Sequence, residues 1–91
     1  MRVTLLGAGH IGQTIARLLA ASGDYQLTVL DRDEAALTRL GALPLQRVTA
    51  ENADPAVLLR HLRGQQAVVN ALPYHLATMA ATQAREAGCH Y

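Results

Sequence analysis

The sequence predicts an α/β fold in which a doubly wound parallel sheet carries helices on both faces. β-type segments alternate with helix-type segments along the whole chain, which is typical of right-handed βαβ units. Four of the seven glycines follow helix-type segments, where a left-handed residue often ends a helix: Gly23, Gly41, Gly64 and Gly88. The other three form the pattern G-x-G-x-x-G over residues 7–12, directly after the first β-type run.

The first half of the chain predicts two βα units. Their segments are a strand over Arg2–Leu6, a helix over Ile11–Ser22, a strand over Gln26–Asp31 and a helix over Glu34–Leu40. Apolar residues of the first helix recur at the spacing of one helical face, which is expected to point inward: Ile11, Ile15, Leu18 and Leu19. Asp33 is placed to cap the second helix.

The second half continues the alternation. A weak strand is expected over Leu45–Thr49, and a third helix begins with Asp54 as cap and Pro55 in its first turn. A buried strand over Ala67–Leu72 and a helix over His75–Ala87 follow. Cys89–Tyr91 resembles the start of a fifth strand. The expected strand order is 3-2-1-4, with the fifth beside the fourth.

Composition limits the possible classes of protein. A chain of 91 residues is one domain at most. Its 51% hydrophobic and 16% charged residues indicate a globular protein, and a net charge of +1 predicts no partnership with nucleic acid or membranes. There is no lysine, so a catalytic lysine is excluded from this stretch. The single Cys89 and the absence of a signal or membrane segment favour the cytoplasm.

The glycine motif predicts a site for a diphosphate. Gly7 allows the sharp turn out of the first strand, Gly9 lets the backbone approach the phosphates, and Gly12 lets the helix pack closely on the sheet. The N–H groups of His10 and Ile11 would then point at the anion from the positive end of the helix. Together with the flanking strand, helix and distal acid, the motif indicates a dinucleotide site.

An acid closes the next strand. Asp31 lies 19 residues beyond Gly12, close to the spacing of about 20 expected for a carboxylate that binds the adenosine ribose. This position favours NAD, because the carboxylate would repel a 2′-phosphate. Arg32 can pair with such a phosphate, so NADP stays open.

Two further residues have alternative interpretations. Glu51 follows the third strand and either reaches the adenine edge or is a surface acid. Asn70 is the one polar residue in the fourth strand; it either contacts the nicotinamide side of the dinucleotide or is satisfied by neighbouring backbone. His75 is expected near the mouth of the crevice. No pair of residues has metal-ligand spacing and no nucleophilic triad is visible, so neither a metal site nor a catalytic residue is predicted.

The sequence resembles the NAD(P)-binding, Rossmann-type domain of the saccharopine dehydrogenase family. The resemblance covers essentially all 91 residues and is carried by M-R-V-T-L-L-G-A-G-H-I-G, by V-L-D-R-D, and above all by V-V-N-A-L-P-Y-H with A-R-E-A-G-C-H-Y. It implies a set of cofactor-binding residues: Gly7, Ala8, Gly9, His10, Ile11, Gly12, Asp31, Arg32, Glu51, Asn70, Ala71, Leu72 and Pro73. Glu51 stands where the family commonly has Asp, which makes its adenine contact doubtful.

The resemblance also implies a function. Members of the family transfer hydride between NAD(P) and the C–N bond of an amino acid, interconverting an imine and a secondary amine. Their substrate and proton-transfer residues come mainly from a second domain. We therefore expect residues 1–91 to be the N-terminal cofactor domain of a longer enzyme, inactive alone, that meets an amino-acid-derived substrate through that missing domain.

Two other interpretations of the sequence are open. One is a nucleotide-sensing regulatory domain of the kind that gates potassium channels, although T-A-E-N-A-D and A-L-P-Y-H differ from the stretches usual there. The other is an inactive domain that pairs with itself as a homodimer through its unfinished sheet edge.

Overall fold

The computed structural model describes all residues, 1–91, and confirms the predicted α/β class. Its centre is a parallel sheet with the order β3-β2-β1-β4, as expected. The strands are β1 (Arg2–Leu6), β2 (Gln26–Asp31), β3 (Gln46–Thr49) and β4 (Ala67–Asn70). The helices are α1 (His10–Ser22), α2 (Glu34–Thr38), α3 (Pro55–Leu62) and α4 (Ala77–Ala87), with a 3₁₀ turn η1 (Tyr74–Leu76) before α4.

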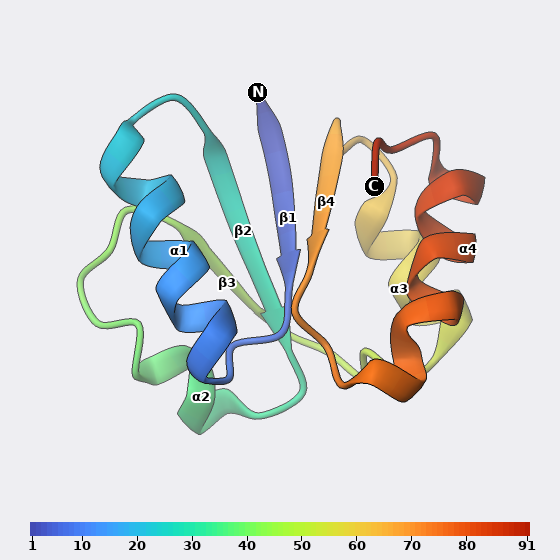
Figure 1. The fold of residues 1–91 in the computed structure, drawn as a ribbon, viewed down its shortest axis with the longest axis horizontal. Helices are drawn as coiled ribbons and strands as arrows, with labels where there is room; N and C mark the ends of the chain where they lie inside the picture. Colours follow the sequence, from blue (N-terminus) through green and yellow to red (C-terminus); the bar gives the residue numbers. More distant parts are fainter.

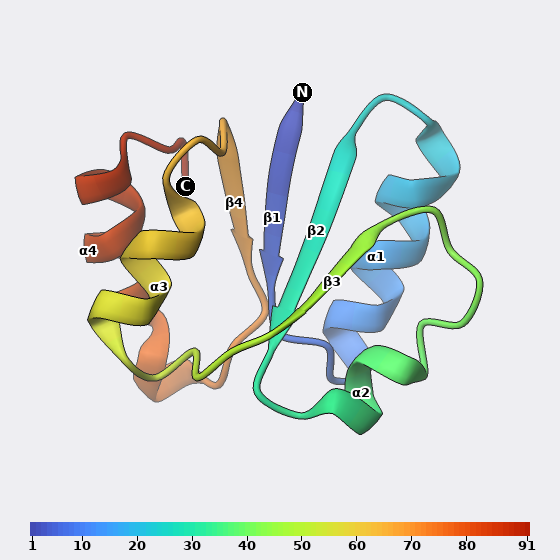
Figure 2. The same ribbon diagram turned by 180° about the vertical axis from the view of Figure 1, so that it is seen from behind.

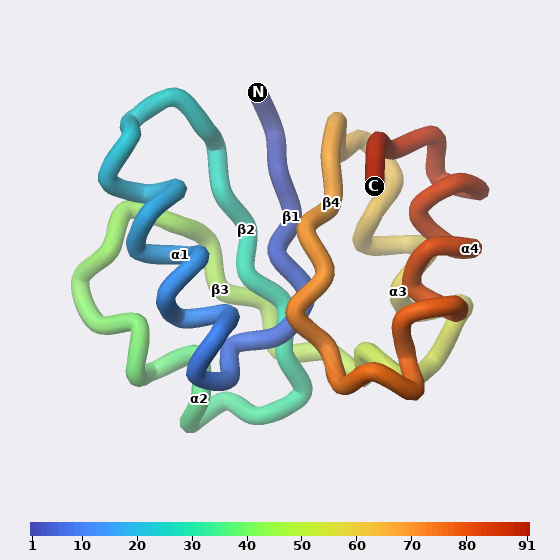
Figure 3. The backbone as a smooth tube through the Cα atoms, viewed as in Figure 1, coloured from blue at the N-terminus to red at the C-terminus, as the bar shows by residue number.

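Helices cover both faces of the sheet. Figures 1 and 2 show α1 and α2 on one side and α3 and α4 on the other. The tube in Figure 3 follows the chain from β3 past the lower end of the sheet to α3, which is where it changes faces. This change of face leaves a crevice between the carboxyl ends of β1 and β4, the usual place for a ligand in such folds. No helix has the length and apolar character needed to cross a membrane.

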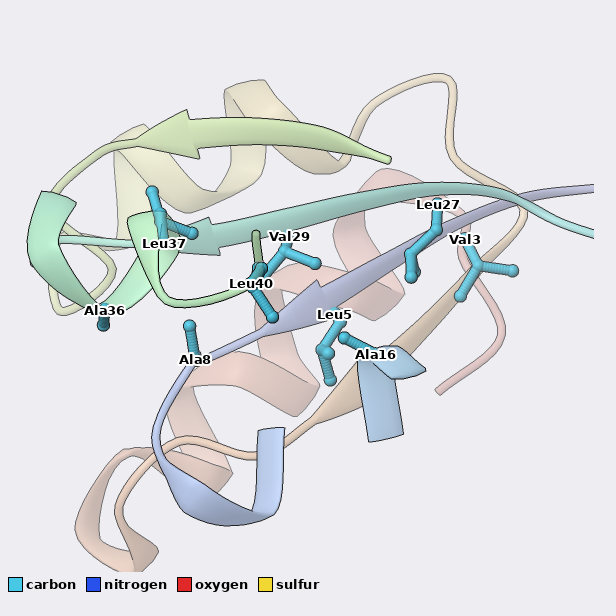
Figure 4. Close-up of a cluster of buried hydrophobic side chains, with 9 residues drawn as sticks. All are labelled: Val3, Leu5, Ala8, Ala16, Leu27, Val29, Ala36, Leu37 and Leu40. Atoms are coloured by element: carbon cyan, nitrogen blue, oxygen red, sulfur yellow. The ribbon is translucent and has the colours of Figure 1, made fainter. Parts of the chain in front are cut away.

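Each face of the sheet has its own aliphatic core. The cluster under α1 and α2 is drawn in Figure 4: Val3, Leu5, Ala8, Ala16, Leu27, Val29, Ala36, Leu37 and Leu40. The cluster under α3 and α4 consists of Leu6, Leu30, Leu58, Leu62, Val68, Ala80 and Ala84. Successive strand residues alternate between the two clusters because side chains of a strand point to opposite faces.

The inner face of α1 differs in part from the prediction. Ile15 and Leu19 pack against the core as expected, but Ile11 and Leu18 are 72% and 69% exposed. Gly12 and Ala16 are buried instead, and a Cβ added to Gly12 would lie 2.1 Å from the carbonyl oxygen of Gly7. The glycine motif therefore decides which side of α1 faces the sheet. Since successive residues of a helix are about 100° apart, Ile11 is turned away from that side.

Other boundaries differ by a few residues. α2 ends at Thr38, although Leu40 beyond it is still buried. β4 ends at Asn70 because the Asn70 Oδ1 accepts the N–H of Leu72 at 2.9 Å, which turns the chain out of the sheet. The predicted fifth strand is a single parallel bridge between Ala67 and His90.

The predicted caps are confirmed. Asp33 accepts the N–H of Ala35 at 3.0 Å, and Asp54 accepts that of Ala56 at the same distance, with Pro55 in the first turn. The four glycines that follow helix-type segments all have φ between 65° and 87°. Local sequence therefore sets where these elements begin and end.

Cys89 fastens the end of the chain to the second core. Its thiol lies 3.2 Å from the carbonyl oxygen of Leu62 and 3.3 Å from that of Gln65. Burial raises the pKa of the Cys89 thiol, so the group keeps its proton at neutral pH and acts as a small apolar side chain with a weak donor.

Gly12→Ala is expected to destabilise the domain by at least about 2 kcal/mol, because the new methyl group collides with the backbone of Gly7. Thermal unfolding measures the effect. Gly9→Ala is the matched control: no atom lies within 4 Å of its added Cβ, so it should lose less than about 1 kcal/mol. Equal losses in both variants would contradict the contact described here.

Thr4→Val is expected to stabilise the domain by about 1 kcal/mol, because Thr4 is 1% exposed and its hydroxyl has no hydrogen-bond partner. Chemical denaturation of the two proteins measures the difference. A loss of stability in the variant would contradict the assignment of this hydroxyl as unpartnered.

Candidate functional site

A cleft of about 580 Å³ opens at the carboxyl ends of the strands. It lies at the point where the chain leaves β1 toward one face of the sheet and β4 toward the other. The lining residues are Gly7, Gly9, His10, Ile11, Gly12, Asp31, Arg32, Asn52, Ala53, Ala71, Leu72, Pro73, His75 and Leu76. Ten of the predicted cofactor-binding residues thus meet in one cleft, whereas Ala8, Glu51 and Asn70 do not line it.

The three glycines of the motif have different reasons to lack a side chain. Gly7 has φ of +98°, and an added Cβ would lie 2.7 Å from the carbonyl oxygen of Ala71. Gly12 packs against Gly7 itself. Gly9 has φ of −72°, and nothing lies within 4 Å of an added Cβ. Folding therefore requires Gly7 and Gly12, while Gly9 leaves open space in the cleft that a side chain would fill.

The backbone of the loop is held firmly at its start. The N–H of Gly7 donates to the carbonyl oxygen of Leu30 at 2.9 Å, and the N–H of Ala8 donates to Oδ2 of Asp31 at 2.7 Å. The side chain of Gln13 donates to the carbonyl oxygen of Ala8 at 3.1 Å. Ala8 is fully buried and supports the loop from behind the cleft.

The next four N–H groups, those of residues 9–12, have no acceptor in the protein. They belong to the first turn of α1, whose N-cap Gly9 offers no side chain to pair with them. Unpaired donors at a helix N-terminus carry a partial positive charge and favour an anion. Four free donors beside the open space at Gly9 fit a diphosphate, which needs close backbone contact and no intervening side chain.

Asp31 lies at the end of β2 and is half-buried in the cleft wall. Its Oδ2 accepts the N–H of Ala8, and its Oδ1 accepts the N–H of Asp33 at 2.8 Å. Each carboxylate oxygen has a second lone pair, so both can still accept a hydroxyl. Arg32 beside it is exposed and lines the cleft.

The exit of β4 forms the opposite wall. Ala71, Leu72 and Pro73 line the cleft, and His75 and Leu76 of η1 extend the wall. Asn70 itself points elsewhere: its Nδ2 donates to the Tyr91 hydroxyl at 2.8 Å, while its Oδ1 holds the N–H of Leu72. Neighbouring backbone satisfies only the oxygen of this amide, and the hydroxyl of Tyr91 satisfies its nitrogen.

The loop after β3 contributes residues that sequence reasoning did not select. Glu51 is exposed, and its Oε1 accepts the N–H of Ala53 at 3.1 Å. Asn52 and Ala53 line the cleft in its place. Asn52 and Ala53 do not belong to a periodic segment, so no hydrophobic pattern predicts which way they face. The one feature of the sequence that points to them is that Asn52 is next to the predicted acid, Glu51.

Comparison with solved structures supports the fold. Over 97% of its length the chain superposes on 20% of apo saccharopine dehydrogenase (L-Glu forming) from Saccharomyces cerevisiae, with TM-score 0.83 and 24% identity. Over 98% of its length the chain also superposes on 37% of a dTDP-glucose 4,6-dehydratase from Streptomyces venezuelae that was solved with NAD bound, with TM-score 0.74 and 27% identity. A third match is a nucleoside-diphosphate-sugar epimerase from Pseudomonas aeruginosa. Here 98% of the chain superposes on 31% of the epimerase, with TM-score 0.77 and 26% identity.

The chain thus spans about a fifth of the yeast dehydrogenase. Similar folds also occur in enzymes described as epimerases and dehydratases, so structural likeness alone indicates an NAD(P)-type fold and no single reaction. The model of the saccharopine dehydrogenase NADP-binding domain matches residues 3–91. The match covers nearly the whole chain, and the protein belongs to that family of NAD(P)-binding Rossmann domains.

Proposed function

We propose that the cleft holds the diphosphate of an adenine dinucleotide above Gly9. The single observation that carries this proposal is the contrast among the glycines: Gly9 has no steric reason within the protein to lack a side chain. The four free N–H groups of residues 9–12 surround the same space. A dinucleotide explains both features, because its diphosphate needs the space and accepts from the donors.

The two walls of the cleft take the two halves of the nucleotide. Asp31 accepts hydroxyls of the adenosine ribose with the lone pairs that its backbone bonds leave free. Ala71, Leu72 and Pro73 line the path to the nicotinamide. Asn70 supports this wall by holding the amide of Leu72, without touching the nucleotide. Glu51 supports the wall on the adenosine side in the same way, because its carboxylate accepts the N–H of Ala53.

The cofactor that this geometry favours is NAD. The Asp31 carboxylate would lie beside the ribose, and at an effective dielectric of about 20 two like charges about 4 Å apart repel by up to a few kcal/mol, which disfavours a 2′-phosphate there. Arg32 provides the opposite tendency, because its exposed side chain lines the same wall and carries a positive charge. The repulsion of a 2′-phosphate by Asp31 and its attraction by Arg32 together determine whether NAD or NADP binds more tightly.

The reaction we propose is hydride transfer between NAD(P) and the C–N bond of an amino-acid-derived compound. Family membership supports it, together with the likeness to a saccharopine dehydrogenase. The nicotinamide ring supplies or accepts the hydride, and this chain binds and orients it. Substrate-binding and proton-transfer groups come from a further domain, so residues 1–91 act as the cofactor domain of a longer cytoplasmic enzyme and show no turnover alone.

NAD should raise the melting temperature of the 91-residue chain more than NADP at equal concentration, because a nucleotide that binds more tightly stabilises the folded state more. Thermal shift assays over a range of concentrations test this. In Arg32→Gln, the response to NADP should fall while that to NAD stays. A stronger response to NADP in the parent chain would reverse the cofactor assignment.

Gly9→Val should abolish the melting shift that NAD produces, because the branched side chain occupies the space assigned to the diphosphate. The unliganded melting temperature should change little, since no protein atom lies within 4 Å of the added Cβ. Calorimetric titration with NAD provides a second measurement. Unchanged affinity in a folded Gly9→Val variant would place the diphosphate elsewhere.

A further inference from the structure

Asn52 is a buried amide without a partner. It is only 5% exposed, yet neither its Nδ2 nor its Oδ1 takes part in a hydrogen bond within the protein. Most amides of residues this buried are paired within the folded protein. Its position therefore needs an explanation beyond packing.

The surface that Asn52 retains lies in the cleft. Two other polar atoms lack partners, the hydroxyl of Thr4 and Oε1 of Gln65, and both are sealed from solvent. The amide atoms of Asn52 are not sealed, and the residue lines the cleft described above. A partner for this amide can therefore arrive only from the cleft.

The position of Asn52 identifies which part of a bound nucleotide it meets. Thr49 of β3 is the register partner of Asp31, and the N–H of Ala50 donates to the carbonyl oxygen of Asp31 at 3.1 Å. Asn52 follows two residues after Ala50, in the segment that leads from β3 toward α3, so it lies close to Asp31 and lines the same cleft. A dinucleotide with its diphosphate at the glycine loop and its adenosine ribose at Asp31 would bring its base to Asn52.

The geometry points to Asn52 as the residue that recognises the adenine base. This inference rests on the proposed function. An amide offers one donor group and one acceptor, which match the 6-amino group of adenine and the ring nitrogen beside it; asparagine pairs with adenine in this manner in other complexes. The neighbouring Glu51 cannot supply this pair, because its carboxylate has no donor and already holds the N–H of Ala53.

The test compares NAD with 1,N6-etheno-NAD in the parent chain and in Asn52→Leu. The etheno bridge occupies N1 and N6 of the base, so no orientation of the amide can form the donor–acceptor pair. Leucine has the same number of side-chain heavy atoms and the same branching as asparagine, and its side chain forms no hydrogen bond. Titration calorimetry of both nucleotides with both proteins gives four affinities. The preference for NAD in the parent chain, divided by the same preference in Asn52→Leu, isolates the hydrogen-bonded pair from any effect of the larger base.

The parent chain should bind NAD roughly tenfold more tightly than the etheno analogue, the scale of one good base contact. Asn52→Leu should lose most of this preference, through weaker binding of NAD. A preference that stays the same in Asn52→Leu, with NAD still bound, would overturn the role of Asn52 and leave the dinucleotide site standing. Failure of the parent chain to bind either nucleotide would instead overturn the proposed function.

Asn52→Ala is the second variant, should the leucine variant fail to fold. It removes both the donor and the acceptor of the amide and adds no charge. The same loss of preference for NAD over the etheno analogue is expected, and an unchanged preference would overturn the inference. Glu86 of α4 is exposed and does not line the cleft, so Glu86→Gln is the control and should keep the preference.

Discussion

The contact between Gly12 and the carbonyl group of Gly7 is the constraint on which the rest of the site depends. An added Cβ at Gly12 would come within 2.1 Å of that oxygen, so the helix and the loop before it touch backbone to backbone. This contact sets the rotation of α1 about its axis, which buries Ala16 and exposes Ile11. It also brings the first turn of the helix, with its unpaired N–H groups, to the mouth of the cleft.

Asp31 secures the same loop from the other side. Its carboxylate accepts the N–H of Ala8, while the N–H of Gly7 donates to Leu30 at the end of the same strand. The loop is therefore tied to β2 before any ligand binds, and the donors that remain free are those aimed at the cleft. Because the loop is already ordered, little conformational entropy remains to be lost when an anion binds. One side chain thus serves the fold and, in the proposed function, the ribose as well.

The loops after β3 and β4 each contain a side chain that supports the backbone and residues that line the cleft. In each loop one polar side chain holds backbone: Glu51 holds Ala53, and Asn70 holds Leu72. The held residues, Ala53 and Leu72, line the cleft. Asn52 differs from both supports, because its amide is buried beside the cleft with nothing in the protein to bind. On this side of the cleft, the residue proposed to recognise the ligand is therefore Asn52, because its amide has no hydrogen-bond partner within the protein.

The sequence by itself determined the α/β class, the order of the strands, the helix caps and the glycine loop, because each depends on short-range patterns: periodicity, a capping side chain, or a missing Cβ. Only the tertiary structure decided the exposure of Ile11 and Leu18, the exclusion of Ala8, Glu51 and Asn70 from the cleft, and the entry of Asn52. These outcomes depend on atoms far apart in the chain, such as Gly7 packing against Ala71. No local pattern encodes such contacts, because they exist only after the sheet has assembled.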